Sequence, residues 1–223
     1  MAAPVQWMPM SDLSRYLPLS QRRHDDESGV TGDWREPFAA TLRSLADTLQ
    51  SLPPSGWDAA SARQGVSVRD TVADAVTALT ATPRQRAASR LLRRTPERVD
   101  DTPAELVAAL RSIAETGRKR RIADLSEAVL AAVDVARALE AAGLPHRIAV
   151  APHASGAVAL ARSLSAPLPV RAVLRGLTLA ARDGGWRVGH GAVRTAAASD
   201  IVLFLFGRSG VPDEAPADYD GDE

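Results

Sequence analysis

The chain has 223 residues, of which 45% are hydrophobic and only 4% aromatic. Aliphatic side chains and alanine must therefore fill the core, which favours helices. The 27 basic residues balance the 27 acidic ones, and this argues against a nucleic-acid binder, which would carry a basic excess. The absence of cysteine excludes disulfides, thiolate metal ligands and cysteine nucleophiles, so thiol chemistry would need an external thiol.

The charge and hydrophobicity of the sequence indicate no targeting signal. No basic region followed by an apolar run begins the sequence, and the longest apolar run, residues 201–206, is too short to span a bilayer. We therefore expect a cytoplasmic protein with no membrane partner. Lys119 is the only lysine beside many arginines, which with the alanine content is typical of a GC-rich, actinobacteria-like source.

The N-terminal part is expected to hold a flexible arm and two helices. Residues 1–34 mix charge with prolines, as flexible arms do. Apolar residues recur at spacings of three and four over residues 36–52, which predicts a helix. A second helix is predicted over 67–80, because Ser67 and Asp70 have the spacing of a capping box.

Three further helices are predicted before residue 166. Thr102, a following proline and Glu105 mark the start of one that runs to about residue 116. The others cover about 121–142 and 154–164. The first four amphipathic helices, up to residue 142, have short connections and predict a four-helix bundle, within a domain that covers residues 35–166 and includes the further helix at 154–164.

Arginines are concentrated between residues 84 and 98, where a short basic helix is expected. They could contact phosphates, or they could form a solvated helix face, which is the reading we favour.

The pattern changes from helical spacing to alternation near residue 173. A strand over 173–181, a turn at Asp183–Gly185 and a strand over 186–188 predict a hairpin. We expect it to form a small α+β domain over residues 167–210, with another strand at 192–196 and an apolar helix at 201–206. The acidic residues 211–223 are expected to be a disordered tail.

Two stretches carry a family resemblance. The first, residues 56–76, contains Trp57, Gly65, Val68, Arg69 and Asp70 at matching positions. In these residues it resembles the mycothiol-dependent maleylpyruvate isomerase family of DinB-like proteins. Val66 stands where that family has a second tryptophan, and Asp74 stands at a metal-binding histidine position. The second stretch, residues 175–208, is similar to the family's small sterol-carrier-like domain and ends in the same glycine-arginine pair.

The segment 125–139 is similar to the family's fourth bundle helix. Glu127 and Asp134 match its acidic positions, whereas Ala131 stands at the second histidine position. The resemblance implies a mainly α fold with a small α+β part, namely a DinB-like four-helix bundle followed by a sterol-carrier-like α+β domain.

The resemblance also implies a divalent metal, held by two histidines and a glutamate, that activates the thiol of mycothiol. Only Glu127 of that ligand set is kept, and Asp74 and Glu127 alone make a weak site for a hard cation. Both residues lie off the apolar stripes of their predicted helices, and we favour the interpretation that they are two solvated acids. His153 or His190 could replace a missing ligand, whereas His24 and His146 are expected to be surface residues.

Arg208 closes the glycine-arginine ending. The resemblance places it near a cleft, where it could hold a carboxylate of a substrate or thiol. It could instead complement the dipole of the preceding helix.

Three hypotheses follow. The first is a maleylpyruvate isomerase-like protein with a degenerate metal site, non-catalytic or altered in function, that binds a small molecule. The second is an active isomerase or transferase dependent on a divalent metal and mycothiol, acting on a small organic acid or electrophile through a shifted ligand set. The third is a DNA- or protein-binding factor that uses the arginines of residues 84–98. The oligomeric state is left open.

Overall fold

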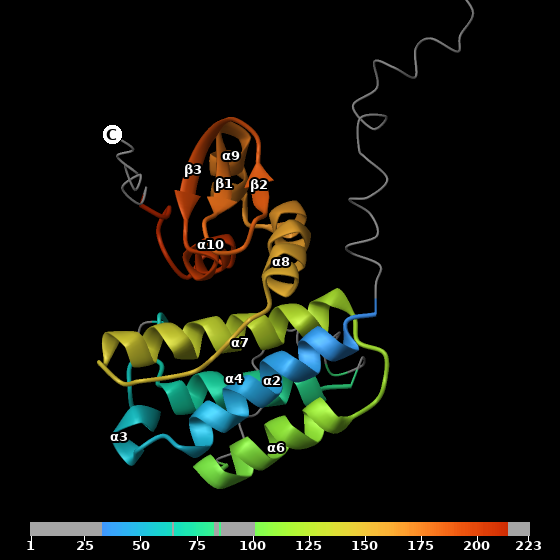
Figure 1. Cartoon of the computed structure of the whole chain (residues 1–223), viewed down its shortest axis with the longest axis vertical. Helices are drawn as coiled ribbons and strands as arrows, with labels where there is room; N and C mark the ends of the chain where they lie inside the picture. Colours follow the sequence, from blue (N-terminus) through green and yellow to red (C-terminus); the bar gives the residue numbers. More distant parts are fainter. Residues whose placement is uncertain (1–32, 64, 83–84, 86–100, 214–223) are drawn as a thin grey trace, which may run out of the picture. The chain divides into compact units, whose positions relative to one another are not determined.

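The computed structural model describes residues 33–63, 65–82, 85 and 101–213 (Figure 1). These residues are mainly helical and contain one small three-stranded sheet, as predicted from the sequence. Most of the expected N-terminal arm, nearly all of the arginine-rich segment 84–98 and the acidic tail from residue 214 lie outside the described residues. The helices are α2 (Arg35–Gln50), α3 (Pro54–Trp57), α4 (Val68–Thr80), α6 (Pro103–Glu115), α7 (Ile122–Ala141), α8 (Pro152–Ser165), α9 (Leu168–Gly176) and α10 (Ala198–Leu205).

The four helices α2, α4, α6 and α7 pack around one apolar core (Figure 1). Both α2 and α4 contact α6 and α7. The stripe predicted on the first helix is buried, since Phe38, Leu42, Leu45 and Leu49 are each at most 1% exposed. Burying each such side chain contributes about 1.5–3 kcal/mol, so aliphatic packing holds this core together.

Two helices begin at the predicted capping boxes. Ser67 Oγ accepts a hydrogen bond from the Asp70 backbone N–H at 3.1 Å, and Asp70 Oδ2 accepts one from the Ser67 N–H at 2.9 Å. Thr102 and Glu105 make the same exchange at the start of α6. Each box satisfies backbone donors that a helix start leaves without partners, which explains why sequence alone located these ends.

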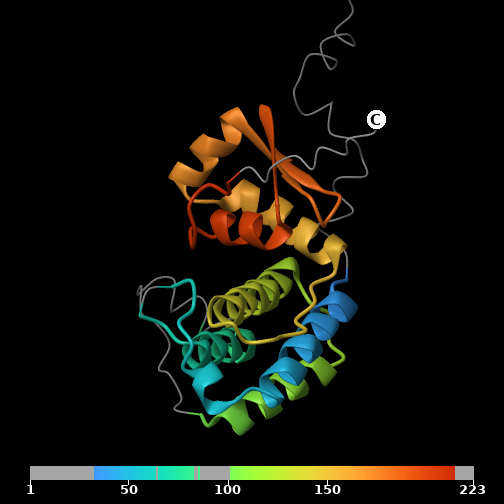
Figure 2. The same ribbon diagram turned by 60° about the vertical axis from the view of Figure 1, so that its left-hand side comes forward.

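The C-terminal region contains strands β1 (Leu177–Ala181), β2 (Arg187–Gly189) and β3 (Ala192–Ala196). β1 pairs antiparallel with β2, with Leu179 opposite Val188, which confirms the predicted hairpin. β3 lies on the other side of β1 and pairs parallel to it. Figure 2 shows this sheet together with α9 and α10.

Two sequence-based predictions need correction. Residues 173–176, expected to begin a strand, form the end of α9, and the strand starts only at Leu177. Val170 and Leu174 are four residues apart and both buried, so this helix is stabilised by packing that its β-branched residues and prolines do not indicate. The segment after α2, for which no helix was predicted, forms the one-turn helix α3, which buries Trp57.

Helices α8 and α10 contribute to two apolar clusters. Val202 and Leu203 of α10 join the bundle core, whereas Ile201 and Phe204 join the core under the sheet. Two arginine–aspartate pairs add polar ties from α7 to this end of the chain. Arg137 Nη2 lies 2.6 Å from Asp200 of α10, and Asp134 pairs with Arg208.

Within the described residues, no single helix has both the length and the apolar composition to cross a membrane. Only α8 and α9 taken together meet that test, and they are bent by 109° relative to each other.

Candidate ligand-binding cavity

A cavity of about 230 Å³ is lined by α4, α7, the loop that precedes α4 and Arg208, which follows α10. Its charged wall residues come from four separate segments of the chain and are Arg63, Asp74, Glu127 and Arg208. Alanine and leucine side chains of α4 and α7 form much of the remaining wall. The cavity thus combines an apolar floor with a small number of charged groups, which is the usual composition of a small-molecule site.

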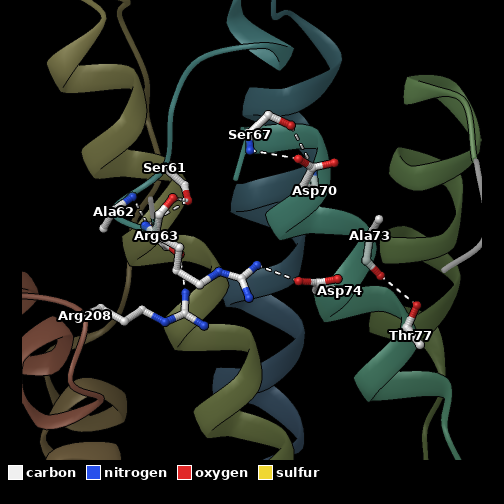
Figure 3. A network of polar contacts seen from close by, with 10 residues as sticks. Ser61, Ala62, Arg63, Ser67, Asp70, Ala73, Asp74, Thr77 and Arg208 are labelled. Atoms are coloured by element: carbon white, nitrogen blue, oxygen red, sulfur yellow. Dashed lines mark hydrogen bonds and ion pairs between the residues drawn. The ribbon is translucent and has the colours of Figure 1, made fainter. Parts of the chain in front are cut away.

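Arg63 reaches the cavity from the loop between α3 and α4. The loop is closed by backbone hydrogen bonds from Ser61 to Val66, at 2.8 Å, and from Val68 to Ala59, at 2.9 Å. Arg63 Nη2 lies 2.5 Å from Asp74 Oδ2, and both side chains are about one-third exposed (Figure 3). The guanidinium therefore covers one oxygen of the carboxylate that the resemblance implied as a metal ligand.

Asp134 holds two parts of the cavity wall in place. Its side chain is fully buried in α7, where Oδ1 accepts a hydrogen bond from the Ala62 backbone N–H at 3.0 Å. Its other oxygen, Oδ2, accepts a hydrogen bond from Arg208 Nη1. One buried carboxylate thus fixes both the loop that carries Arg63 and the side chain of Arg208, which explains an acid in the middle of an apolar helix.

Arg208 follows α10 and its side chain is 19% exposed. Burial lowers the pKa of the Arg208 guanidinium from its ordinary value, and the positive charge of Arg63 lowers it further. Asp134 and Glu127 oppose both effects by raising it. The two guanidiniums are therefore close enough to repel each other, and Figure 3 shows them side by side near Asp74.

The structure brings together the residues that sequence reasoning singled out. Asp74, Glu127 and Arg208 line the same cavity, and Ala131 lies in its wall between them. The helix positions that the resemblance aligned with a ligand set therefore do face one space. His153 and His190 are exposed and do not line this cavity, so the structure does not bring either one to it.

The donor set of the cavity does not fit a transition metal. Zinc and nickel sites need imidazole or thiolate ligands, and this wall offers only the carboxylates of Asp74 and Glu127. Asp74 is already paired with a guanidinium, whose charge repels a divalent cation. Across the part of the chain that the structure describes, no group of three or more histidine, cysteine, aspartate or glutamate side chains could hold a metal ion.

Sequence reasoning missed several residues of the wall, and Arg63 and Thr71 are two of them. Arg63 lies in a loop without periodicity, so only the fold reveals that it meets Asp74. Thr71 lies one turn before Asp74 on α4, is 3% exposed and also lines the cavity. Its Oγ1 and the Nε of Arg63 are both buried and have no hydrogen-bond partner among the described residues. Such buried donors are rare in proteins, and each could donate to a ligand or a water.

Comparison of the chain with family models, curated proteins and solved structures finds no match. The resemblance to the maleylpyruvate isomerase family therefore stays a prediction from the residues of the chain, and the geometry of the cavity carries the functional argument.

Proposed function

We propose that this chain is a maleylpyruvate isomerase-like, DinB-superfamily protein with a degenerate metal site, which binds a small molecule and does not carry out metal- and thiol-dependent isomerisation. The ion pair between Arg63 and Asp74 carries this proposal. It supplies a fixed positive charge at the position where the resemblance implies a metal. Ala131, at the second histidine position, offers a methyl group to the same wall.

The rival function is an active divalent-metal- and mycothiol-dependent isomerase or transferase. One observation favours it, namely that Glu127 lines the cavity together with Asp74. For this function Arg63 would have to leave Asp74, and at least one nitrogen ligand would have to come from elsewhere. The two functions therefore differ in one measurable property, the affinity of the folded chain for zinc or nickel.

Titration of zinc into chelator-treated, dialysed protein, followed by calorimetry, tests the proposal. The wild-type chain should show no saturable zinc site. It offers two carboxylates, one of them paired with a guanidinium, and these cannot hold zinc against competition from water and buffer. The matched variant is Asp74→His with Ala131→His, which places two imidazoles beside Glu127 and removes the partner of Arg63. It should bind about one zinc per chain.

The alternative results have distinct meanings. A saturable, tight zinc site in the wild-type chain would overturn the degenerate-site proposal in favour of the active enzyme. Failure of the double variant to gain zinc, while its circular dichroism stays that of the wild type, would contradict the alignment of α4 and α7 with the ligand-bearing helices of the family.

A further inference from the structure

Large apolar side chains are exposed where α8 meets α9. Leu168 is 73% exposed and Leu164 is 61% exposed, the two highest values among the exposed large hydrophobic residues that the structure describes. All of residues 164–169 except Ala166 are exposed, and α8 and α9 are bent by 109° relative to each other at this point. Residues 164–169, named the α8–α9 corner below, therefore present an apolar tip to solvent.

The outward face of α9 continues from this tip into positive charge. Val170 and Leu174 are buried, and α9 packs on β1 and β2. Leu168, Arg171 and Arg175 follow one another at spacings of three and four residues, so they share the opposite face of the helix. Both arginines are exposed. One side of α9 thus holds the helix on the sheet, and the other offers an exposed leucine with two guanidiniums behind it.

The segment that carries the corner contains no acid. Residues 141–182 include five arginines and no aspartate or glutamate, although the whole chain has 27 acids. Glu140, which precedes this segment, pairs with Arg137. Asp183, which follows it, accepts a hydrogen bond at 2.7 Å from a backbone N–H at the start of α10. The local surplus of positive charge favours a negatively charged partner, even though the chain as a whole is neutral.

An apolar tip backed by cations matches the layers of an anionic bilayer. Leucines on such a tip can enter the boundary between headgroups and acyl chains, while long arginine side chains keep their charge at the level of the lipid phosphates. A peptide strand or helix is instead recognised at a sheet edge or in a groove. A corner formed by a sharp bend between two helices offers a tip, which favours the lipid surface over a peptide.

We propose that the α8–α9 corner docks on an anionic lipid surface, with Leu164 and Leu168 inserted among the headgroups and Arg171 and Arg175 bound to lipid phosphates. The protein would lie on the membrane without spanning it. The sequence-based expectation of no membrane partner rested on the lack of a spanning segment, which surface binding does not require. This inference goes beyond the proposed function and does not depend on it.

Co-sedimentation of the full chain with lipid vesicles tests the proposal. Vesicles of phosphatidylglycerol and phosphatidylcholine in equal parts supply the anionic surface, and vesicles of phosphatidylcholine alone are the neutral control. Binding at about 0.05 M salt should be at least about tenfold tighter to the anionic vesicles, and about 0.5 M salt should weaken it strongly by screening. No binding to the anionic vesicles, or equal binding to both kinds, would overturn the proposal.

Substitutions at exposed positions identify the surface that makes the contact. Leu168→Gln should weaken binding to anionic vesicles about tenfold, because it removes an inserted apolar side chain. Arg175→Gln should weaken it about fivefold, the effect of one cation near a charged membrane. The matched control is Val193→Gln on β3, since Val193 is 58% exposed and lies outside the corner. Equal affinity of Leu168→Gln and Val193→Gln would contradict insertion of the corner.

Two further results would assign the binding or the surface elsewhere. Arg93→Gln combined with Arg94→Gln alters the arginine-rich segment 84–98 and should leave vesicle binding unchanged. Loss of binding in that variant, with retention in Leu168→Gln, would overturn the proposal. Light scattering tests a second copy of the chain as the partner. A wild-type dimer that Leu168→Gln converts to a monomer, without change in vesicle binding, would show that the corner is a protein interface and contradict the lipid contact.

Discussion

Arg63 and Asp74 meet across the wall of the cavity, with Nη2 of the arginine 2.5 Å from Oδ2 of the aspartate. The arginine comes from a loop that a second aspartate, Asp134, anchors to α7. Because Asp134 also holds Arg208, the two cations of the cavity depend on the same buried carboxylate. The arrangement of the site and the stability of the fold are therefore coupled, and variants of these residues test both.

Removing the Asp134 carboxylate should destabilise the protein strongly. Asp134→Ala leaves Arg208 half-buried without its partner and the Ala62 N–H without its acceptor. We expect a loss of about 3 kcal/mol in the free energy of unfolding by urea. Arg137→Ala is the matched control, because it breaks an exposed pair one turn further along α7 and should cost less than about 1 kcal/mol. Similar losses in the two variants would contradict the anchoring role of Asp134.

The capping box at the start of α4 should contribute measurably to stability. Ser67→Ala removes the acceptor of the Asp70 N–H and should cost about 1 kcal/mol. Ser199→Ala, in the first turn of α10, removes a hydroxyl that caps no helix and should change stability by less than about 0.5 kcal/mol. Urea unfolding followed by circular dichroism measures both, and a neutral Ser67→Ala would show that the box is not formed in solution.

The second box predicts a pH dependence. The hydrogen bonds from the Thr102 hydroxyl and backbone N–H lower the pKa of Glu105 from its ordinary value of 4.5. Because the folded-state pKa is the lower one, the stabilisation is complete above pH 4.5 and is lost as the pH falls through the lowered value. In Glu105→Gln the amide does not titrate, so this part of the pH dependence should disappear.

Urea unfolding of wild type and Glu105→Gln from pH 6 down to pH 3 measures the effect. The stability difference between the two should shrink toward low pH. A difference that stays constant over this range would contradict the ionised cap.

Gly156 should tolerate no side chain because α8 lies against Trp186. A Cβ built at Gly156 would lie 2.8 Å from Cδ1 of the indole, whose Nε1 donates to Ser155 Oγ at 3.0 Å. Gly156→Ala should therefore displace the ring, change the tryptophan fluorescence and cost about 1–3 kcal/mol. Gly210→Ala introduces a methyl group into open space and should have neither effect. An unchanged emission spectrum in Gly156→Ala would contradict this packing.

The parts of the fold that sequence predicted are those fixed by local chemistry. Ser67 and Thr102 mark helix starts because capping is completed within four residues, and Asp183–Gly185 marks a turn for a similar reason. By contrast, α9 contains Val170 and Val173 beside two prolines, and it is helical because one face packs on the small sheet. The parallel pairing of β1 with β3 likewise has no local signal.

The candidate site was predictable only in part for the same reason. Asp74, Glu127 and Arg208 were identified through a resemblance, and the fold brings them to one cavity. Arg63 carries no motif, since its role depends on a loop closed by backbone hydrogen bonds and anchored to a residue 72 positions away. Asp74 and Glu127 alone would attract a cation, whereas the guanidinium of Arg63 repels one. No sequence pattern indicates this role of Arg63.

Elemental analysis of the wild-type chain tests most directly whether an arginine has taken the place of a metal. The protein should be purified without chelator and dialysed against metal-free buffer before measurement. We predict zinc and nickel contents far below one ion per chain, because Arg63 covers Asp74 and Glu127 alone does not retain either metal. A content of about one zinc or nickel ion per chain would contradict the account.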